Sequence, residues 1–227
     1  MELHRSGDRF ATDAEGRRTR HSFSFGSHYD PDNLRFGLLV CHNDDLVLPG
    51  GGYPDHPHSN LEIVTWVLSG ALRHTDSQGH TGVVEPGLVQ VMSAGSGVVH
   101  SETVDAASGP TRFIQTWVLP DEPGGATTYS SAAAELAGEW LPVVSGSHPD
   151  AATRISASGA TLYAARLAAG ERVEVPETPL AHLFVTTGSA VLDDTTLGEG
   201  DAVRLRTEGG TITASAPTEL LLWTFAG

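Results

Sequence analysis

The sequence predicts an all-β protein. Its apolar runs are short and are interrupted by turn residues, since the 227 residues include 26 glycines and 13 prolines. Short runs separated by turn signals about every ten residues are typical of β-sandwiches and small β-barrels. Hydrophobic residues make up 39% of the composition, so the chain can form a core in one large domain or in two of about a hundred residues each.

In the first half, strands are expected where β-branched and aromatic residues lie between turn signals. The turn signals include residues 49–52, 76–79 and 95–97. The expected strands are residues 35–40, 61–68, 83–84, 88–92, 98–102 and 113–119.

Residues 120–149 form a less regular join between the halves. Ser130 precedes an alanine-rich stretch, which predicts a short helix over residues 130–137 with the serine as N-cap. The strands expected after the join are residues 161–167, 172–175, 181–187, 190–192, 202–205, 211–214 and 220–225. Because both halves contain similar short strands that end at glycine, we interpret them as diverged copies of one β-unit.

Charge and cysteine content limit the classes of partner. The formal net charge is −15, so we expect no direct contact with nucleic acid or an anionic membrane, both of which attract basic surfaces. All basic residues are arginine, which excludes a Schiff-base lysine. Cys41 is the single cysteine and the first residues are not apolar like a signal peptide; we therefore expect a cytoplasmic protein.

Two short motifs predict a metal site. His56 and His58 are spaced i, i+2, and so are His100 and Glu102. In a β-strand this spacing places both side chains on one face. Two adjacent strands would therefore direct three imidazoles and one carboxylate to one point, a donor set suited to a first-row transition metal.

Glu62 is a second candidate for the carboxylate. It follows His58 at a spacing that shares its parity if a single strand runs from His56 through Glu62. The residues alone leave both glutamates open as ligands.

The remaining histidines and large apolar residues receive structural interpretations. His74 and His80 flank the turn at residues 76–79 and are expected to be solvated. We expect Phe36, Trp66, Met92 and Cys41 to lie in the core.

These motifs and their flanks resemble the pirin family of the cupin superfamily. The matching segments of the first half are HSFSFG (21–26), PGGG (49–52), HPH (56–58), EIVT (62–65), LRHTDS (72–77), VMSAGSG (91–97), HSE (100–102) and QTWV (115–118). The second half matches loosely, as in LYAARL (162–167). Two departures are Ser59, where pirins commonly have a basic residue, and Leu88, where they often have an acid. Substrate preference therefore does not transfer from the family.

The resemblance implies a bicupin fold with two jelly-roll-like β-barrel domains and a short connecting helix. We expect an N-terminal metal-binding cupin over residues 1–125, and a linker helix with a C-terminal cupin that lacks a metal site over residues 126–227. The second half agrees with this expectation, because His182 has no partner at i+2.

The resemblance also implies a ligand set and a metal. The pirin ligands correspond here to His56, His58, His100 and Glu102, with iron(II) as the expected metal and Mn, Co, Ni, Cu or Zn as alternatives. Ordinary cupins use the glutamate at the position of Glu62 instead. In the pirin interpretation Glu62 orients a ligand imidazole.

Two functions follow from the resemblance. Some pirins are similar to quercetin 2,3-dioxygenases, which implies a small aromatic or enolic substrate, O2 as co-substrate, and Glu102 as catalytic base as well as ligand. The alternative is an iron-dependent, redox-sensing regulatory protein that binds a protein partner without efficient turnover. In either case we expect a monomer.

Overall fold

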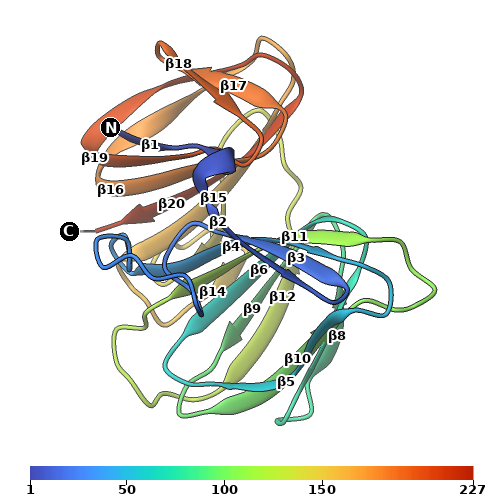
Figure 1. The fold of residues 1–227 in the computed structure, drawn as a ribbon. Helices are drawn as coiled ribbons and strands as arrows, with labels where there is room; N and C mark the ends of the chain where they lie inside the picture. Colours follow the sequence, from blue (N-terminus) through green and yellow to red (C-terminus); the bar gives the residue numbers. More distant parts are fainter. Residues whose placement is uncertain (227) are drawn as a thin grey trace. The chain divides into compact units, whose positions relative to one another are not determined.

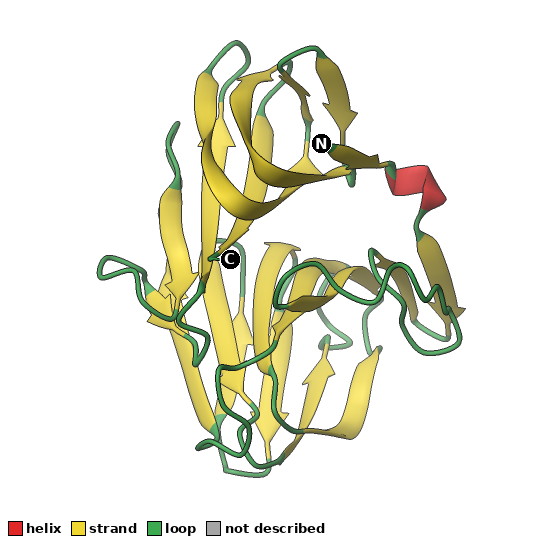
Figure 2. Ribbon diagram, turned by 90° about the vertical axis from the view of Figure 1, so that its left-hand side faces the viewer, coloured by secondary structure: helices red, strands yellow, loops and turns green. Residues whose placement is uncertain are grey.

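The described chain, residues 1–226 of a computed structural model, consists almost wholly of β-strands (Figure 1). Its one helical segment is a single 3₁₀ turn, η1 (Ser6–Asp8), drawn in red in Figure 2. The all-β prediction is confirmed. The chain divides into a first unit, Phe10–Ala133 with Thr153–Ala157, and a second unit made of Met1–Arg9, Ala134–Ala152 and the chain from Ser158 onward.

The first unit contains two antiparallel sheets. One has seven strands in the order β12-β9-β6-β11-β4-β3-β2, and the other has four in the order β5-β10-β7-β8. The strands of this unit are β2 (Phe10–Ala14), β3 (Arg17–His21), β4 (Leu39–Val47), β5 (Gly52–His58), β6 (Glu62–Ser69), β7 (Leu72–Asp76), β8 (Thr81–Val84), β9 (Leu88–Ser93), β10 (Val98–Thr103), β11 (Thr111–Val118), β12 (Thr128–Ala133) and the short β14 (Thr153–Arg154).

The core of the first unit lies between its two sheets. Val47, Val67 and Phe113 of the seven-stranded sheet pack in one buried cluster with Leu72 and Val84 of the four-stranded sheet. This is the packing of a β-sandwich, in which alternate residues of each strand point inward. The strand order of the described residues leaves both ends of each sheet open, so neither sheet closes into a barrel.

The second unit is built on one antiparallel sheet. Its strands follow the order β13-β15-β20-β16-β19-β17-β18, and β1 pairs with β19. They are β1 (Glu2–His4), β13 (Leu141–Ser145), β15 (Ala160–Leu167), β16 (Arg172–Thr187), β17 (Ser189–Leu192), β18 (Thr195–Gly198), β19 (Ala202–Ala214) and β20 (Thr218–Phe225). β16 and β19 each join two of the expected strands into one longer strand.

The predicted helix over residues 130–137 is wrong. Its first half is β12, which pairs residue by residue with β9 from Thr128↔Ser93 to Ala133↔Leu88. The hydroxyl of Ser130 bonds that of Thr153 (2.6 Å). A single short helix is marginally stable by itself, so the ladder of hydrogen bonds to β9 outweighs the helix propensity of alanine.

Burial confirms the expected core residues: Phe36, Trp66, Met92 and Cys41 are all at most 2% exposed. Among the described residues, no helix is long and apolar enough to cross a membrane.

Candidate metal centre

Three histidine side chains meet where β5 and β10 pair. The antiparallel register places His100 opposite His56 and Val98 opposite His58. The ring centroids are 4.4 Å apart for His56 and His100, 4.9 Å for His56 and His58, and 5.1 Å for His58 and His100. One ring nitrogen from each lies within 4.8 Å of the others. The i, i+2 spacing thus brings the three predicted imidazoles together.

The segment after His58 is not a continuous strand. β5 ends at His58, and Asn60, with φ of 56°, lies in the turn that leads into β6. The expected single strand from His56 through Glu62 is therefore wrong. Glu62 begins β6, in the other sheet, and its carboxylate accepts hydrogen bonds from Ser93 (2.5 Å) and Ser156 rather than from an imidazole.

The ring nitrogens of the cluster are suited to binding a metal. His56 Nδ1 donates to the carbonyl oxygen of Pro54 (2.7 Å), which leaves its Nε2 with a lone pair. The Nε2 atoms of His58 and His100 are buried and have no hydrogen-bond partner. Buried polar atoms are rarely left without a partner unless a ligand or ion satisfies them. These residues therefore fit a metal ion.

The electrostatics of the cluster keep the imidazoles of His58 and His100 neutral. Burial, followed by the nearby His56, lowers the pKa of His58 to about 4. Burial, together with the neighbouring imidazoles, lowers the pKa of His100 to about 3. Neutral imidazole is the form that coordinates metals, so no proton has to be released from these rings near pH 7.

Glu102 is two residues after His100 on β10, and a β-bulge lies between them. The Gln115 amide donates to both carboxylate oxygens (2.9 and 2.7 Å), and the indole of Trp117 donates to Gln115 Oε1 (3.1 Å). Trp117 therefore fixes which end of the amide faces Glu102. Burial, with a smaller contribution from Asp45, raises the pKa of the Glu102 carboxyl to about 7.

His74 is a buried member of the site that the sequence interpretation placed in solvent, and that expectation is wrong. The side chain is 0% exposed, and its ring nitrogen lies within 4.8 Å of ligand atoms of His100 and Glu102. A signal was present in the sequence: Leu72, His74 and Asp76 share one strand parity, and all three point inward, whereas Arg73 and Thr75 are exposed.

A cavity of about 300 Å³ opens onto the cluster. Two aromatic side chains form part of its wall: Trp117, edge-on to His58 (4.8 Å between centroids), and Phe25, which contacts Trp117 (5.3 Å). The lining residues are Arg17, Phe25, Asn43, Tyr53, Pro54, Asp55, His56, His58, Glu102, Gln115 and Trp117.

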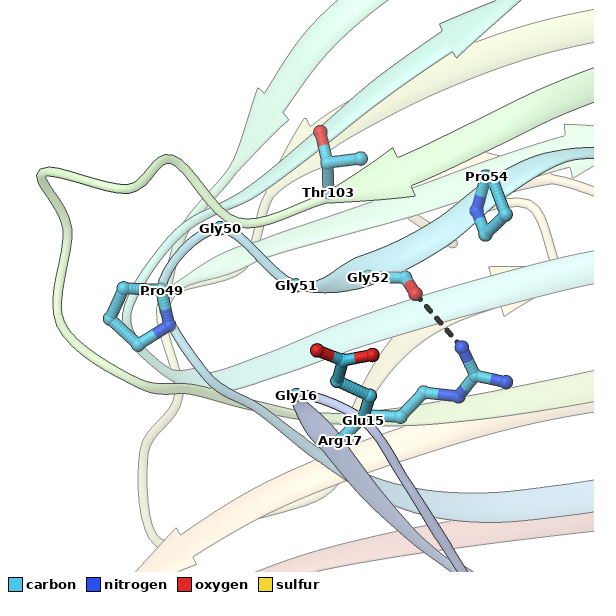
Figure 3. Close-up of a pocket in the computed structure, with 9 residues that line it drawn as sticks. All are labelled: Glu15, Gly16, Arg17, Pro49, Gly50, Gly51, Gly52, Pro54 and Thr103. Carbon is cyan, nitrogen blue, oxygen red and sulfur yellow. Dashed lines mark hydrogen bonds between the residues drawn. The ribbon is translucent and has the colours of Figure 1, made fainter.

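A second, more open hollow of about 530 Å³ adjoins this cavity and shares Arg17 and Pro54 with it (Figure 3). The Arg17 guanidinium donates to the carbonyl oxygen of Gly52 (3.0 Å) and lies over the Tyr53 ring (4.3 Å). Arg17 is the basic side chain in the lining of both spaces, so it places positive charge at their junction.

Comparison with known proteins matches both halves of the chain. A family model described as Pirin covers residues 4–118. The chain belongs to the pirin family. A second model, described as Quercetinase C-terminal cupin domain, covers residues 128–224, which accounts for the second half that had matched pirins only loosely.

Named relatives match the chain either over nearly its full length or over about half of it. A Mycobacterium tuberculosis protein named "Putative quercetin 2,3-dioxygenase Rv0181c" is 45% identical over 229 residues, which covers 98% of this chain and 94% of the relative. The Escherichia coli "Quercetin 2,3-dioxygenase" is 41% identical over 104 residues, 46% of this chain and 45% of that protein.

A solved pirin structure has the same fold. The bacterial pirin YhhW from Escherichia coli, in complex with nickel(II), superposes with a TM-score of 0.92 at 27% identity and covers 99% of this chain and 98% of that one. The expected bicupin fold is confirmed, apart from its connecting helix.

Proposed function

We propose that this pirin-family protein is a metal-dependent dioxygenase of quercetin-type flavonols or related enolic and phenolic substrates. The observation that supports this best is the placement of His56, His58 and Glu102 in the wall of a cavity of about 300 Å³, with His100 completing the histidine cluster. The names of the mycobacterial and E. coli relatives support the reaction class. We also propose a cytoplasmic location, because a chain with one cysteine has no internal disulfide that needs an oxidising compartment.

We propose that His56, His58, His100 and Glu102 bind one divalent metal, with iron(II) as the native ion and Mn, Co, Ni, Cu or Zn as ions that the same donors accept. Three neutral imidazoles and one carboxylate leave a net charge of about +1 on a site holding a divalent ion, which favours an anionic substrate oxygen. When bound, the metal supplies Lewis acidity toward that oxygen and a route for electrons between the substrate and O2.

Glu102 is the proposed base. Its carboxylate lines the cavity and accepts the proton of the substrate hydroxyl, while the Gln115 amide holds it in place. Gln115 is in turn oriented by Trp117. Burial makes the carboxyl a stronger base than an exposed glutamate, since it disfavours the ionised form.

The cavity walls suit a flat, partly polar ring system. Phe25 and Trp117 provide aromatic surface, and Asn43 and Tyr53 provide polar groups along the lining. In the proposed reaction both atoms of O2 enter the products: the central flavonol ring is opened to an ester and one ring carbon leaves as carbon monoxide.

Turnover of quercetin tests the proposal. The metal-free protein is loaded with Fe(II), Mn(II), Co(II) or Ni(II), quercetin is added in air, and loss of its near-visible absorbance is followed together with O2 uptake. We expect turnover that His56→Ala abolishes and that His148→Ala, on a loop of the second unit, leaves unchanged. Metal binding without turnover for every ion would overturn the dioxygenase and favour the regulatory alternative.

A further inference from the structure

A series of hydrogen bonds runs from the histidine cluster across the four-stranded sheet, from His100 on β10 to His74 and Asp76 on β7. His100 Nδ1 lies 3.4 Å from His74 Nδ1, and His74 Nε2 lies 3.2 Å from Asp76 Oδ2. β10 pairs with β7, with His100 opposite Asp76 and Glu102 opposite His74. All three hydrogen-bonded side chains are buried, since His74 and His100 are at most 1% exposed and the Asp76 side chain is 0% exposed.

The position of every proton in this series follows from Asp76. Its Oδ1 accepts from the backbone N–H groups of Gln78 (2.9 Å) and His80 (3.0 Å). Its Oδ2 faces His74 Nε2 and His80 Nδ1 (3.0 Å). A carboxylate surrounded by four such groups acts only as an acceptor. His74 therefore has its proton on Nε2 and presents a bare Nδ1 to His100.

The same argument determines which ring nitrogen of His100 carries the proton. Since His74 Nδ1 can only accept, the bond between the two rings requires the proton of neutral His100 to lie on Nδ1. The Nε2 of His100 is then a bare lone pair, and this is the buried atom that has no other hydrogen-bond partner. Burial of both rings keeps solvent from offering an alternative partner.

We propose that Asp76 and His74 are positioning residues that hold His100 in the tautomer whose Nε2 is free to bind the metal. The inference rests on the proposed function only in treating His100 as a ligand. Carboxylate–histidine pairs behind a ligand commonly set its tautomer, and their loss typically weakens metal binding about 10- to 100-fold.

The hydrogen-bonded series Asp76–His74–His100 is called the relay below. His80 and Tyr129 contact it but do not lie between Asp76 and His100. His80 contacts the same Asp76 oxygen, but its side chain is 39% exposed and it does not reach His100. The Tyr129 ring stacks on His74 and His80, with centroids at 4.8 and 5.5 Å, and so covers the relay. His80 therefore offers a matched control that keeps the path from Asp76 to His100 intact.

Asp76→Asn keeps the shape of the side chain but should exchange the donor and acceptor roles along the relay. The two backbone N–H groups at Oδ1 keep the amide oxygen of the variant at that position, so its NH2 group faces His74. His74 must then accept at Nε2 and hold its proton on Nδ1. His100 can keep the bond only by losing its Nδ1 proton, which places a proton on Nε2, the ligand atom.

The test combines imidazole ¹⁵N chemical shifts of the metal-free protein with a titration of the same proteins by Ni(II). We expect His100 to be protonated on Nδ1 in the wild type and in His80→Ala, and on Nε2 in Asp76→Asn. Nickel affinity should fall about 10- to 100-fold in Asp76→Asn and change less than about twofold in His80→Ala.

The outcomes separate the relay from the metal site. An unchanged His100 tautomer, or unchanged nickel affinity, in Asp76→Asn would overturn the relay. A wild type that binds no metal would overturn the proposed metal centre, whereas the tautomer measurement would still decide on the relay. Should Asp76→Asn fail to fold, His74→Phe serves in its place, and we expect it to yield a mixture of His100 tautomers; a pure Nδ1–H form would contradict the proposal.

Discussion

At the scale of single residues, the two glutamates that competed in the sequence have different surroundings. Glu102 borders the cavity and lies with His74 and His100, whereas Glu62, on the other sheet, accepts hydrogen bonds from Ser93 and Ser156. The structure thus places Glu102 beside His100, one of the three clustered histidines, whereas the Glu62 carboxylate is hydrogen-bonded by two serines.

The two glutamates can be distinguished by measuring metal affinity in matched variants. We expect Glu102→Gln to lower the affinity at least about tenfold, because a neutral amide replaces the one anionic donor. Glu62→Gln should leave the affinity within about twofold of the wild type. Isothermal titration with Ni(II) checks both, and a larger loss in Glu62→Gln than in Glu102→Gln would reverse the assignment.

The candidate site was predictable from the sequence where two of its residues lie close together on one strand. His56, His58, His100 and Glu102 follow from an i, i+2 spacing that a strand converts directly into a shared face. His74 and Gln115 were missed because their roles depend on which strands are neighbours, and pairing of β10 with β7 is a long-range property. Strand parity with Leu72 and Asp76 would have placed His74 inside, but the expectation of a solvated side chain was based on the nearby turn.

At the scale of elements, the site depends on close approach of β5 and β10 at Gly52. This residue has φ of 143°, and a Cβ there would meet the carbonyl oxygen of Glu102 and, at 2.7 Å, Thr103 Cα. Both contacts are with backbone, which cannot rotate away. The register that aligns His56 with His100 therefore requires glycine at this position.

Gly52→Ala is expected to damage stability and metal binding together. Strain at a left-handed position and the backbone clash should destabilise the fold by at least about 2 kcal/mol. The clash should also push β5 away from β10, which would separate His56 from His100 and weaken metal binding. Urea unfolding and nickel titration measure the two effects.

Gly109→Ala is the control, because a Cβ at Gly109 meets nothing within 4 Å. Equal effects of the two substitutions would contradict a specific role for the approach of β5 to β10.

The strand β12 shows where element prediction fails. Ser130 and the alanines after it favour a helix locally, yet this segment completes the edge of a sheet by pairing with β9. Local helix propensity contributes only tenths of a kcal/mol per residue, so pairing with another strand can outweigh it. That partner strand lies some forty residues earlier in the chain, where a local sequence pattern does not reveal it. The strand and turn pattern of the rest was regular enough to predict the fold class.

At the scale of the whole chain, the N-terminal segment belongs to the second unit. β1 pairs with β19, and Asp201 accepts hydrogen bonds from the Ser6 N–H (2.8 Å), the Gly198 N–H (3.0 Å) and Arg5 (2.7 Å). Burial alone would raise the pKa of the Asp201 carboxyl, but these hydrogen bonds and the Arg5 charge outweigh it and lower the pKa. Asp201 thus ties the beginning of the chain to its last third.

Asp201→Asn should lower stability in a pH-dependent manner. Because the folded-state pKa lies below the unfolded value near 4, the stabilisation is present above that pH and is lost as the pH falls through the folded-state pKa. We expect a loss of about 1–3 kcal/mol at pH 7 that shrinks toward pH 3.5. Urea unfolding across this range measures it, with Asp194→Asn at an exposed position as control. A constant loss at every pH would contradict the assignment to the carboxylate charge.

β5 is the first strand of the four-stranded sheet, so one of its sides has no neighbouring strand in that sheet. An edge strand exposes unpaired N–H and C=O groups to which another polypeptide can add a strand. Two of its seven residues, Pro54 and Pro57, have no N–H to offer. The strand that contains His56 and His58 therefore offers fewer N–H groups for intermolecular β-pairing, and the proline between the two histidines removes one of them.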